Sequence, residues 1–167
     1  MTARSSLSQK HTLQDWLQWQ ETLHPSTIDL GLSRIRSVAI VLFGENFVAQ
    51  QPLTITVAGT NGKGSCVTAL SALLRSMGKC VGSFTSPHLL RYNERIRING
   101  KEVSDDDLCA AFSAIDAARG EISLTYFEFN ALAAFWLFKK YRVDVQVLEV
   151  GLGGRLDAVN LVDADIA

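Results

Sequence analysis

The chain has 167 residues, 47% of them hydrophobic and 20% charged, with a formal net charge of −1. This length is typical of one domain with a substantial core, and the small net charge gives no reason to expect nucleic acid or an anionic membrane as a partner. The longest apolar run, residues 131–138, is well short of the ~20 residues that cross a bilayer. The N-terminus has no apolar signal core and the cysteines have no C-x-x-C spacing, so we expect a cytoplasmic protein.

The first half of the chain alternates between helical and extended patterns. In chain order, the predicted elements are helices over 12–23 and 32–43, a strand over 53–57, a helix over 65–77 and a strand over 79–84. The first two helices are separated by the helix-breaking sequence HPSTIDLG, and glycines connect the first strand to the third helix.

The second half continues this alternation. Its predicted elements are a loop over 85–94, a hairpin over 95–103, helices from Ser104 and Thr125, and a strand over 143–150. The Asn99-Gly100 pair predicts the hairpin turn. Ser104 is placed to cap its helix, and Thr125 with Glu128 forms a T-x-x-E capping box. The helix from Thr125 is apolar on nearly every side, which predicts that it is buried.

Strands that alternate with helices predict an α/β domain of three layers, in which helices cover both faces of a mostly parallel sheet. The sequence ADIA at 164–167 has the pattern of a further strand just beginning. Because such domains usually have more strands than this, we expect the chain to be an incomplete domain, the N-terminal portion of a longer protein.

The stretch VAGTNGKGS, residues 57–65, has the character of a phosphate-binding loop but departs from G-x-x-x-x-G-K-[ST] at Val57 and Gly64. The physical requirements are nevertheless met, because the glycines allow backbone N–H groups to turn inward and a helix begins just beyond them. Lys63 adds a positive charge for phosphates, which a purely structural glycine turn would not explain. We therefore expect a P-loop-type domain that binds a nucleotide.

Two other polar positions lie at or just after the carboxyl ends of predicted strands, and these ends form the ligand edge of an open α/β sheet. Glu149 ends the strand over 143–150, where an acid is placed to hold Mg²⁺ near bound phosphates, although it could simply be a partly exposed strand-end acid. Ser86 offers a hydroxyl oxygen, which is also a suitable Mg²⁺ ligand. Glycines that allow backbone to approach a ligand closely come next: Gly151, Gly153 and Gly154.

Other polar side chains in these stretches have two interpretations each. His88 is either a ligand or a polar loop residue. Arg155 and Asp157 either serve the site or pair with each other on the surface. The same choice, between a positive patch for an anionic substrate and a solvated face, applies to three arginines: Arg91, Arg95 and Arg97.

Three stretches, GTNGKGS, FTSPHLLRYNERI and LEVGLGGRLDA, occur in an order and spacing that resemble folylpolyglutamate synthase, and most closely the bacterial bifunctional dihydrofolate synthase/folylpolyglutamate synthases. LHPSTIDLGLSRI and SLTYFEFNALAAFWLF add to the resemblance, which runs from about Leu13 to the last residue. The family is related to the Mur ligases, which share the compact G-T-N-G-K loop. The resemblance therefore implies that the departures at Val57 and Gly64 are typical of the phosphate-binding loops of this group.

What the resemblance implies is an ATP-dependent carboxylate–amine ligase. ATP would phosphorylate a substrate carboxylate, and the amine of L-glutamate would attack the acyl phosphate and release phosphate. The carboxylate would belong to dihydropteroate, giving dihydrofolate, or to a folate, giving its polyglutamate. We expect a monomer that requires ATP and Mg²⁺ and has these small molecules as partners.

The resemblance also implies roles for individual residues. Lys63 and Glu149 would be catalytic, and Ser86 and Glu149 would hold the metal. The ATP phosphates would lie against Gly59, Thr60, Asn61, Gly62, Lys63, Gly64 and Ser65. The pterin would lie against Thr27, Ile28, Asp29, Tyr126, Phe127, Glu128, Leu156, Asp157 and Ala158. Phe127 would supply an aromatic wall, although it could instead be a core aromatic of a buried helix.

The sequence departs from the family pattern in two ways. Val159 stands where the family usually has threonine. The downstream histidine, the carbamylated lysine and the C-terminal domain with the glutamate site have no counterpart in these residues, so we expect residues 1–167 alone to be inactive. A Mur-type ligase that acts on a nucleotide-sugar peptide and a nucleotide-binding module without ligase activity are the alternatives.

Overall fold

Five strands form one mixed sheet, in the order β1-β5-β2-β3-β4, in the computed structural model, which describes residues 12–26 and 28–167. The strands are β1 (Leu53–Val57), β2 (Val81–Phe84), β3 (Ile96–Ile98), β4 (Lys101–Glu102) and β5 (Val145–Glu149). β5 pairs in parallel with both β1 and β2, whereas β3 pairs antiparallel with β2 and with β4. The predicted strands and hairpin are therefore confirmed, and Ile166 adds a single parallel bridge to Ile55 of β1.

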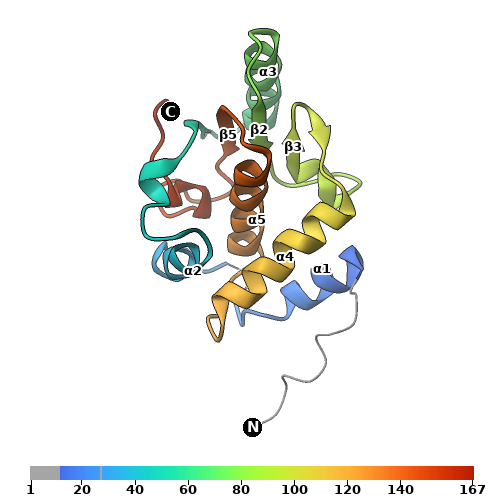
Figure 1. Ribbon diagram of the computed structural model, residues 1–167, viewed down its shortest axis with the longest axis vertical. Helices are drawn as coiled ribbons and strands as arrows, with labels where there is room; N and C mark the ends of the chain where they lie inside the picture. The colour runs from blue at the N-terminus through green and yellow to red at the C-terminus, as the bar shows by residue number, and fades with distance from the viewer. Residues whose placement is uncertain (1–11, 27) are drawn as a thin grey trace.

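Helices cover both faces of this sheet, as the alternating pattern predicted. They are α1 (Leu13–Glu21), α2 (Ser33–Phe43), α3 (Lys63–Ser76), α4 (Asp105–Arg119) and α5 (Tyr126–Tyr141), with short 3₁₀ helices η1 (Val48–Gln50), η2 (Tyr92–Arg95) and η3 (Ala158–Leu161). Figure 1 shows α3 at one end, apart from the group formed by α1, α2, α4 and α5. In the described part of the chain, no helix is long and apolar enough to cross a membrane.

Two apolar clusters divide the core between the faces of the sheet. Alternate residues of β5 point to opposite faces, so Val145 and Val147 pack under α3 while Leu148 packs on the other side. The larger cluster is centred on α5, whose interior positions are buried as its nearly continuous apolar surface predicted. Because Glu149 follows Val147 by two positions, its side chain lies on the α3 face, beside the phosphate loop.

Local capping fixes where the helices of the site begin. The predicted box at α5 is present, since Glu128 N donates to Thr125 Oγ1 at 3.2 Å and Thr125 N donates to Glu128 Oε2 at 2.8 Å. Ser104 caps α4 by accepting from Asp107 N at 3.1 Å. Helix α3 begins at Lys63, two residues before the predicted start at Ser65. The box at α5 thereby places residues 126–128 at the ligand edge of the sheet.

Candidate functional site

The glycine loop joins β1 to α3 at the carboxyl edge of the sheet. Gly62 is the N-cap of α3 and has φ 78°, a left-handed conformation that glycine adopts without the steric cost of a Cβ. This conformation turns the chain directly into the helix. The Nζ of Lys63 donates to the carbonyl oxygen of Gly59 at 2.9 Å, so the lysine charge lies across the mouth of the loop. Free N–H groups at a helix start, with a lysine beside them, form an environment suited to phosphate.

Glu149 and Ser86 lie against this loop. The backbone N–H of Ser86 donates to Glu149 Oε2 at 3.0 Å, and the Glu149 side chain is buried at the end of β5. An atom at the Cβ position of Gly64 would lie 3.6 Å from Glu149 Oε2. The first turn of α3 and the carboxylate are therefore in close contact.

A cavity of about 660 Å³ joins these elements, and the proposed phosphate and metal residues line it, except Gly59. Gly59 instead accepts the hydrogen bond from Lys63. The cavity is also lined by Arg97 and Thr85 from the strand side. Residues from the glycine loop, from the segment after β2 and from the end of β5 therefore line one cavity. This agrees with the prediction that the carboxyl ends of the parallel strands meet at one edge.

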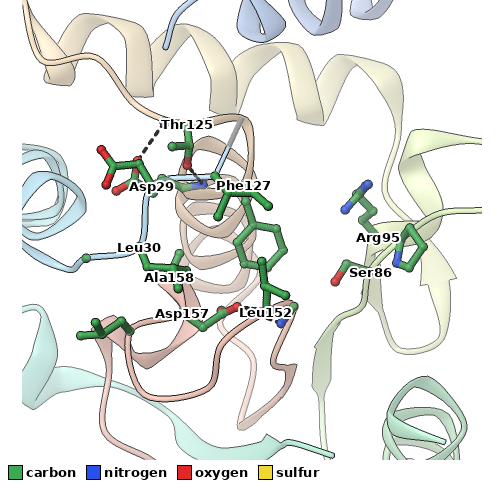
Figure 2. Close-up of a pocket in the computed structure, with 15 residues that line it drawn as sticks. Asp29, Leu30, Ser86, Arg95, Thr125, Phe127, Leu152, Asp157 and Ala158 are labelled. Atoms are coloured by element: carbon green, nitrogen blue, oxygen red, sulfur yellow. Dashed lines mark hydrogen bonds between the residues drawn. The ribbon is translucent and has the colours of Figure 1, made fainter. Parts of the chain in front are cut away.

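A second cavity, of about 280 Å³, lies between the start of α5 and the segments 28–31 and 151–158. Figure 2 shows Phe127 on one side of it, with Arg95 and Ser86 on the other. Its lining includes most of the proposed substrate residues: Ile28, Asp29, Phe127, Glu128, Leu156, Asp157 and Ala158. Thr27 lies outside the described residues. Tyr126 is not part of the lining and packs against Tyr92, with ring centroids 6.3 Å apart.

The two cavities meet at one place in the fold. Ser86 and Pro87 line both of them. A ligand in the smaller cavity and a nucleotide on the glycine loop would therefore have their nearest ends on either side of this dipeptide.

Phe127 is only partly buried, unlike the core aromatics that follow it in α5. Its ring contacts that of Phe84, with centroids 5.7 Å apart, and its other side faces the cavity (Figure 2). The ring also lies directly over Gly151, where an added Cβ would be 2.5 Å from Phe127 Cζ. The absence of a side chain at 151 therefore makes room for the cavity wall.

We expect Gly151→Ala to push the Phe127 ring out of place and to lower the free energy of unfolding by about 1–2 kcal/mol, because overpacking forces side chains off their preferred conformations. Denaturant unfolding measures this change. Adding Phe127→Leu removes the ring tip and should restore most of the loss caused by the alanine. If the double variant shows the same loss as the sum of the two single changes, the Gly151–Phe127 contact is not its cause.

Asp157 holds the loop that forms the floor of the smaller cavity. Its carboxylate accepts hydrogen bonds from three backbone N–H groups: Gly151 at 2.9 Å, Leu152 at 2.8 Å and Val159 at 3.0 Å. Burial raises the pKa of Asp157, and the three hydrogen bonds act in the opposite direction. The interpretation of Arg155 and Asp157 as a surface pair is wrong, because Asp157 is buried and bonds to the backbone while Arg155 is exposed.

The three arginines near β3 do not form one patch. Arg91 is exposed and lies 3.7 Å from Asp105, whereas Arg97 pairs with Glu102 at 3.0 Å and lines the larger cavity. Arg95 is buried and lines the smaller cavity. The three arginines therefore have different environments: Arg91 lies on a solvated face, whereas Arg95 and Arg97 each line a cavity.

His88 is a loop residue with a defined partner. Its Nδ1 accepts a hydrogen bond from Arg95 Nε at 2.8 Å. Burial and the neighbouring Arg95 charge lower the pKa of His88. A neutral imidazole that accepts this bond orients the Arg95 guanidinium. No group of three or more metal-binding side chains occurs among residues 12–26 and 28–167.

Glu94 closes the loop that carries Ser86. Its carboxylate accepts from the N–H groups of Leu89 at 3.0 Å, Leu90 at 2.8 Å and Arg91 at 2.7 Å. These bonds, with Leu89 contributing most, lower the pKa of Glu94 from 4.5 to about 2. One ionised side chain therefore satisfies three successive backbone donors.

We expect Glu94→Gln to lower the melting temperature near neutral pH and to have no effect near pH 2. A carboxylate with a depressed pKa stabilises the fold while it is ionised, so the contribution is present above its ordinary pKa of 4.5 and is lost as the pH falls toward about 2. Thermal melts from pH 2 to pH 7 measure the difference between the two proteins. Glu121→Gln, at an exposed carboxylate, is the control. A difference in melting temperature between wild type and Glu94→Gln that persists unchanged to pH 2 would show that the ionised Glu94 carboxylate is not its cause.

Sequence reasoning missed an ion-pair network beside the smaller cavity. Arg34 of α2 pairs with Asp29 at 2.6 Å and with the buried Glu128 at 3.3 Å, while His24 lies 3.5 Å from Asp29. These bridges connect the 28–31 segment to α2 and α5. The contact between Arg34 and Glu128 joins residues far apart in the sequence, which no local pattern signals. The carboxylates of Asp29 and Glu128 are both engaged by Arg34 while they line the cavity.

The sequence is similar to known folate enzymes over most of its length, although no family model matches it. It is 52% identical over 155 residues to the dihydrofolate synthase/folylpolyglutamate synthase of Escherichia coli K12, covering 93% of this chain and 36% of that protein. The corresponding protein of Haemophilus influenzae is 50% identical over 155 residues, covering 93% of this chain and 35% of the relative.

Solved structures agree with this match. E. coli FolC in complex with DHPP and ADP superposes with a TM-score of 0.88 at 51% identity, covering 93% of this chain and 37% of that one. The bifunctional Yersinia pestis enzyme complexed with AMPPNP and Mn ion gives a TM-score of 0.86 at 51% identity, with the same coverage of 93% and 37%. By sequence and by fold, the chain therefore matches the N-terminal part of the dihydrofolate synthase/folylpolyglutamate synthases, and it spans about 36% of the length of the E. coli protein.

Proposed function

We propose that the chain is the N-terminal, nucleotide- and pterin-binding part of a cytoplasmic, monomeric ATP-dependent ligase. The ligase joins L-glutamate to dihydropteroate and to folates. The observation that carries this proposal is the meeting of the two cavities at Ser86 and Pro87. One cavity has the features of a phosphate site and the other is an apolar slot with an aromatic wall. A ligase that phosphorylates its acceptor needs these two ligands end to end.

The larger cavity has the residues that a nucleotide requires. Lys63 supplies a point charge for the phosphates, and the N-terminus of α3 supplies backbone donors. The 5′-triphosphate would lie along residues 59–65. That E. coli FolC and the Y. pestis enzyme were solved with ADP and with AMPPNP supports an adenine nucleotide as the ligand.

Ser86 and Glu149 fit a divalent cation. Mg²⁺ is usually held by one or two protein oxygens together with substrate phosphates and water, and the Glu149 carboxylate lies beside Ser86 at the rim of the loop. When bound, the ion would neutralise phosphate charge as the γ-phosphoryl group is transferred. That relatives were solved with Mn bound supports a divalent metal as a cofactor.

The smaller cavity fits the flat pterin ring of the acceptor. Phe127 offers a ring face on one wall, and Leu156 with Ala158 adds apolar surface opposite the start of α5. With the pterin here, the acceptor carboxylate would extend toward Ser86. Its oxygen would attack the γ-phosphorus of ATP, giving an acyl phosphate and ADP. The glutamate amine would then attack the acyl carbon, and inorganic phosphate would leave as the amide forms.

The test is ATP-dependent formation of dihydrofolate from dihydropteroate and L-glutamate by the full-length protein that contains this chain. No product with dihydropteroate or with any folate would refute the ligase. We expect residues 1–167 alone to bind ATP without ligation, and measurable turnover by the isolated chain would overturn that expectation. A thermal-shift comparison of dihydropteroate with a UDP-sugar peptide separates the folate ligase from a Mur-type ligase.

A further inference from the structure

Arg95 has an environment that no structural role accounts for fully. The residue is 8% exposed, and arginine is almost never this buried unless it is paired. In the described part of the chain, its guanidinium forms no ion pair and makes one hydrogen bond, from Nε to His88 Nδ1. The two terminal nitrogens have no protein acceptor, and they are not among the fully buried polar atoms of the described residues, so they reach open space at the wall of the molecule.

The guanidinium is nevertheless held in a fixed position. Its central carbon lies 5.8 Å from the centroid of the Tyr92 ring and 5.7 Å from that of Tyr126, and both distances are within the range of cation–π attraction. With His88 fixing Nε, the side chain has little freedom to rotate. The N–H groups of the two terminal nitrogens therefore have one fixed orientation.

That orientation directs the donors at the smaller cavity. Arg95 lines it together with Ser86 and Pro87, and Figure 2 shows the guanidinium beside Ser86, across from Phe127. This is the end of the cavity that adjoins the phosphate loop. A buried, pre-oriented guanidinium with free donors matches a planar carboxylate, which it can bind through two parallel hydrogen bonds.

We propose that Arg95 binds the acceptor carboxylate, holding the oxygen that receives the phosphoryl group at the junction of the two cavities. This inference rests on the proposed function and adds the residue that selects an anionic acceptor. Arg95 is then a catalytic residue in contact with the reacting group. Tyr92, Tyr126 and His88 act through it as positioning residues.

The test is calorimetric binding of two ligands to the chain, dihydropteroate and its neutral carboxamide. We expect wild type to bind the carboxylate about 10- to 100-fold more tightly, the range that a charge-assisted hydrogen-bonded pair supplies. Arg95→Met should remove this preference while leaving carboxamide binding nearly unchanged. Arg95→Lys, which keeps the charge but loses the planar fork, should retain a smaller preference. Arg91→Met, at an exposed arginine that lines neither cavity, should behave as wild type.

The possible results separate this inference from the proposed function. If wild type binds both ligands equally, or if Arg95→Met weakens both by the same factor, Arg95 only packs and the inference is overturned while the ligase proposal stands. If wild type binds neither ligand, the pterin site itself is refuted and Arg95 loses its role with it. The comparison of the two ligands on wild type is informative even where Arg95→Met unfolds.

Discussion

Lys63→Met is expected to weaken ATP binding by the chain about 10- to 100-fold, because a charge-assisted contact to phosphate is worth about 1.5–3 kcal/mol. The lysine lies across the mouth of the loop, with Nζ 2.9 Å from the Gly59 carbonyl oxygen. A neutral methionine of similar length would leave the backbone donors of α3 in place but remove the only positive charge in the glycine stretch 59–65. Isothermal titration with ATP in the presence of Mg²⁺ measures the change.

If the charge of Lys63 is the cause, the Lys63→Met protein should also discriminate between nucleotides. The loss should be largest for ATP, smaller for ADP and absent for adenosine, since we expect only the phosphates to interact with Lys63. Lys79→Met removes an equal charge at an exposed position beyond the other end of α3 and should bind ATP as wild type does. A Lys63→Met protein that keeps its melting temperature and its ATP affinity would show that the loop does not use this lysine for phosphate.

Most of the fold could be predicted from short-range signals. The T-x-x-E sequence at Thr125, the Asn99-Gly100 turn and the β-branched strand over 53–57 each specify a local conformation with little dependence on the rest of the chain. The glycine loop and Glu149 could be brought together because both follow parallel strands, and a topological rule puts the carboxyl ends of such strands at one edge. These predictions depend on one or two neighbouring elements only.

The environment of Arg95 could not be predicted in the same way. In the sequence, arginine alternates with isoleucine over 95–98, which indicates that Arg95 and Arg97 share one face of a strand. The 3₁₀ turn η2 ends at Arg95, so strand alternation begins only at the next residue and the two arginines enter different cavities. The ion pair between Arg34 and Glu128 likewise could not be predicted from the sequence, because it depends on how α2 packs against α5.

Asp157 shows a third kind of limit. The resemblance assigned this residue to the pterin, yet its carboxylate is occupied by the backbone of its own loop. The i to i+2 bond to Val159 is a local pattern typical of aspartate, but the two bonds back to Gly151 and Leu152 depend on how the glycines fold. We therefore expect Asp157 to affect ligand binding through the cavity floor that it holds in place.

We accordingly expect Asp157→Ala to lower the free energy of unfolding by about 2–4 kcal/mol, the cost of losing hydrogen bonds to a charged acceptor and leaving buried donors unpaired. The N–H of Val159 belongs to a fully buried residue and would find no water. Urea unfolding measures the loss. Asp163→Ala, at an exposed carboxylate in the same C-terminal segment, should change stability by less than about 0.5 kcal/mol.

Asp157→Asn distinguishes the acceptor from the charge. Asparagine is neutral and so avoids the cost of burying a charge, the effect that raises the pKa of Asp157. Its NH₂ group, however, would face at least one backbone N–H, and two donors cannot form a hydrogen bond. If the three hydrogen bonds hold the loop, the asparagine protein should be less stable than wild type and more stable than the alanine protein. Its affinity for dihydropteroate should fall in the same order, because Leu152 and Leu156 lose their place in the cavity wall. An asparagine variant as stable as wild type would mean that two acceptor bonds are sufficient to keep the floor of the cavity.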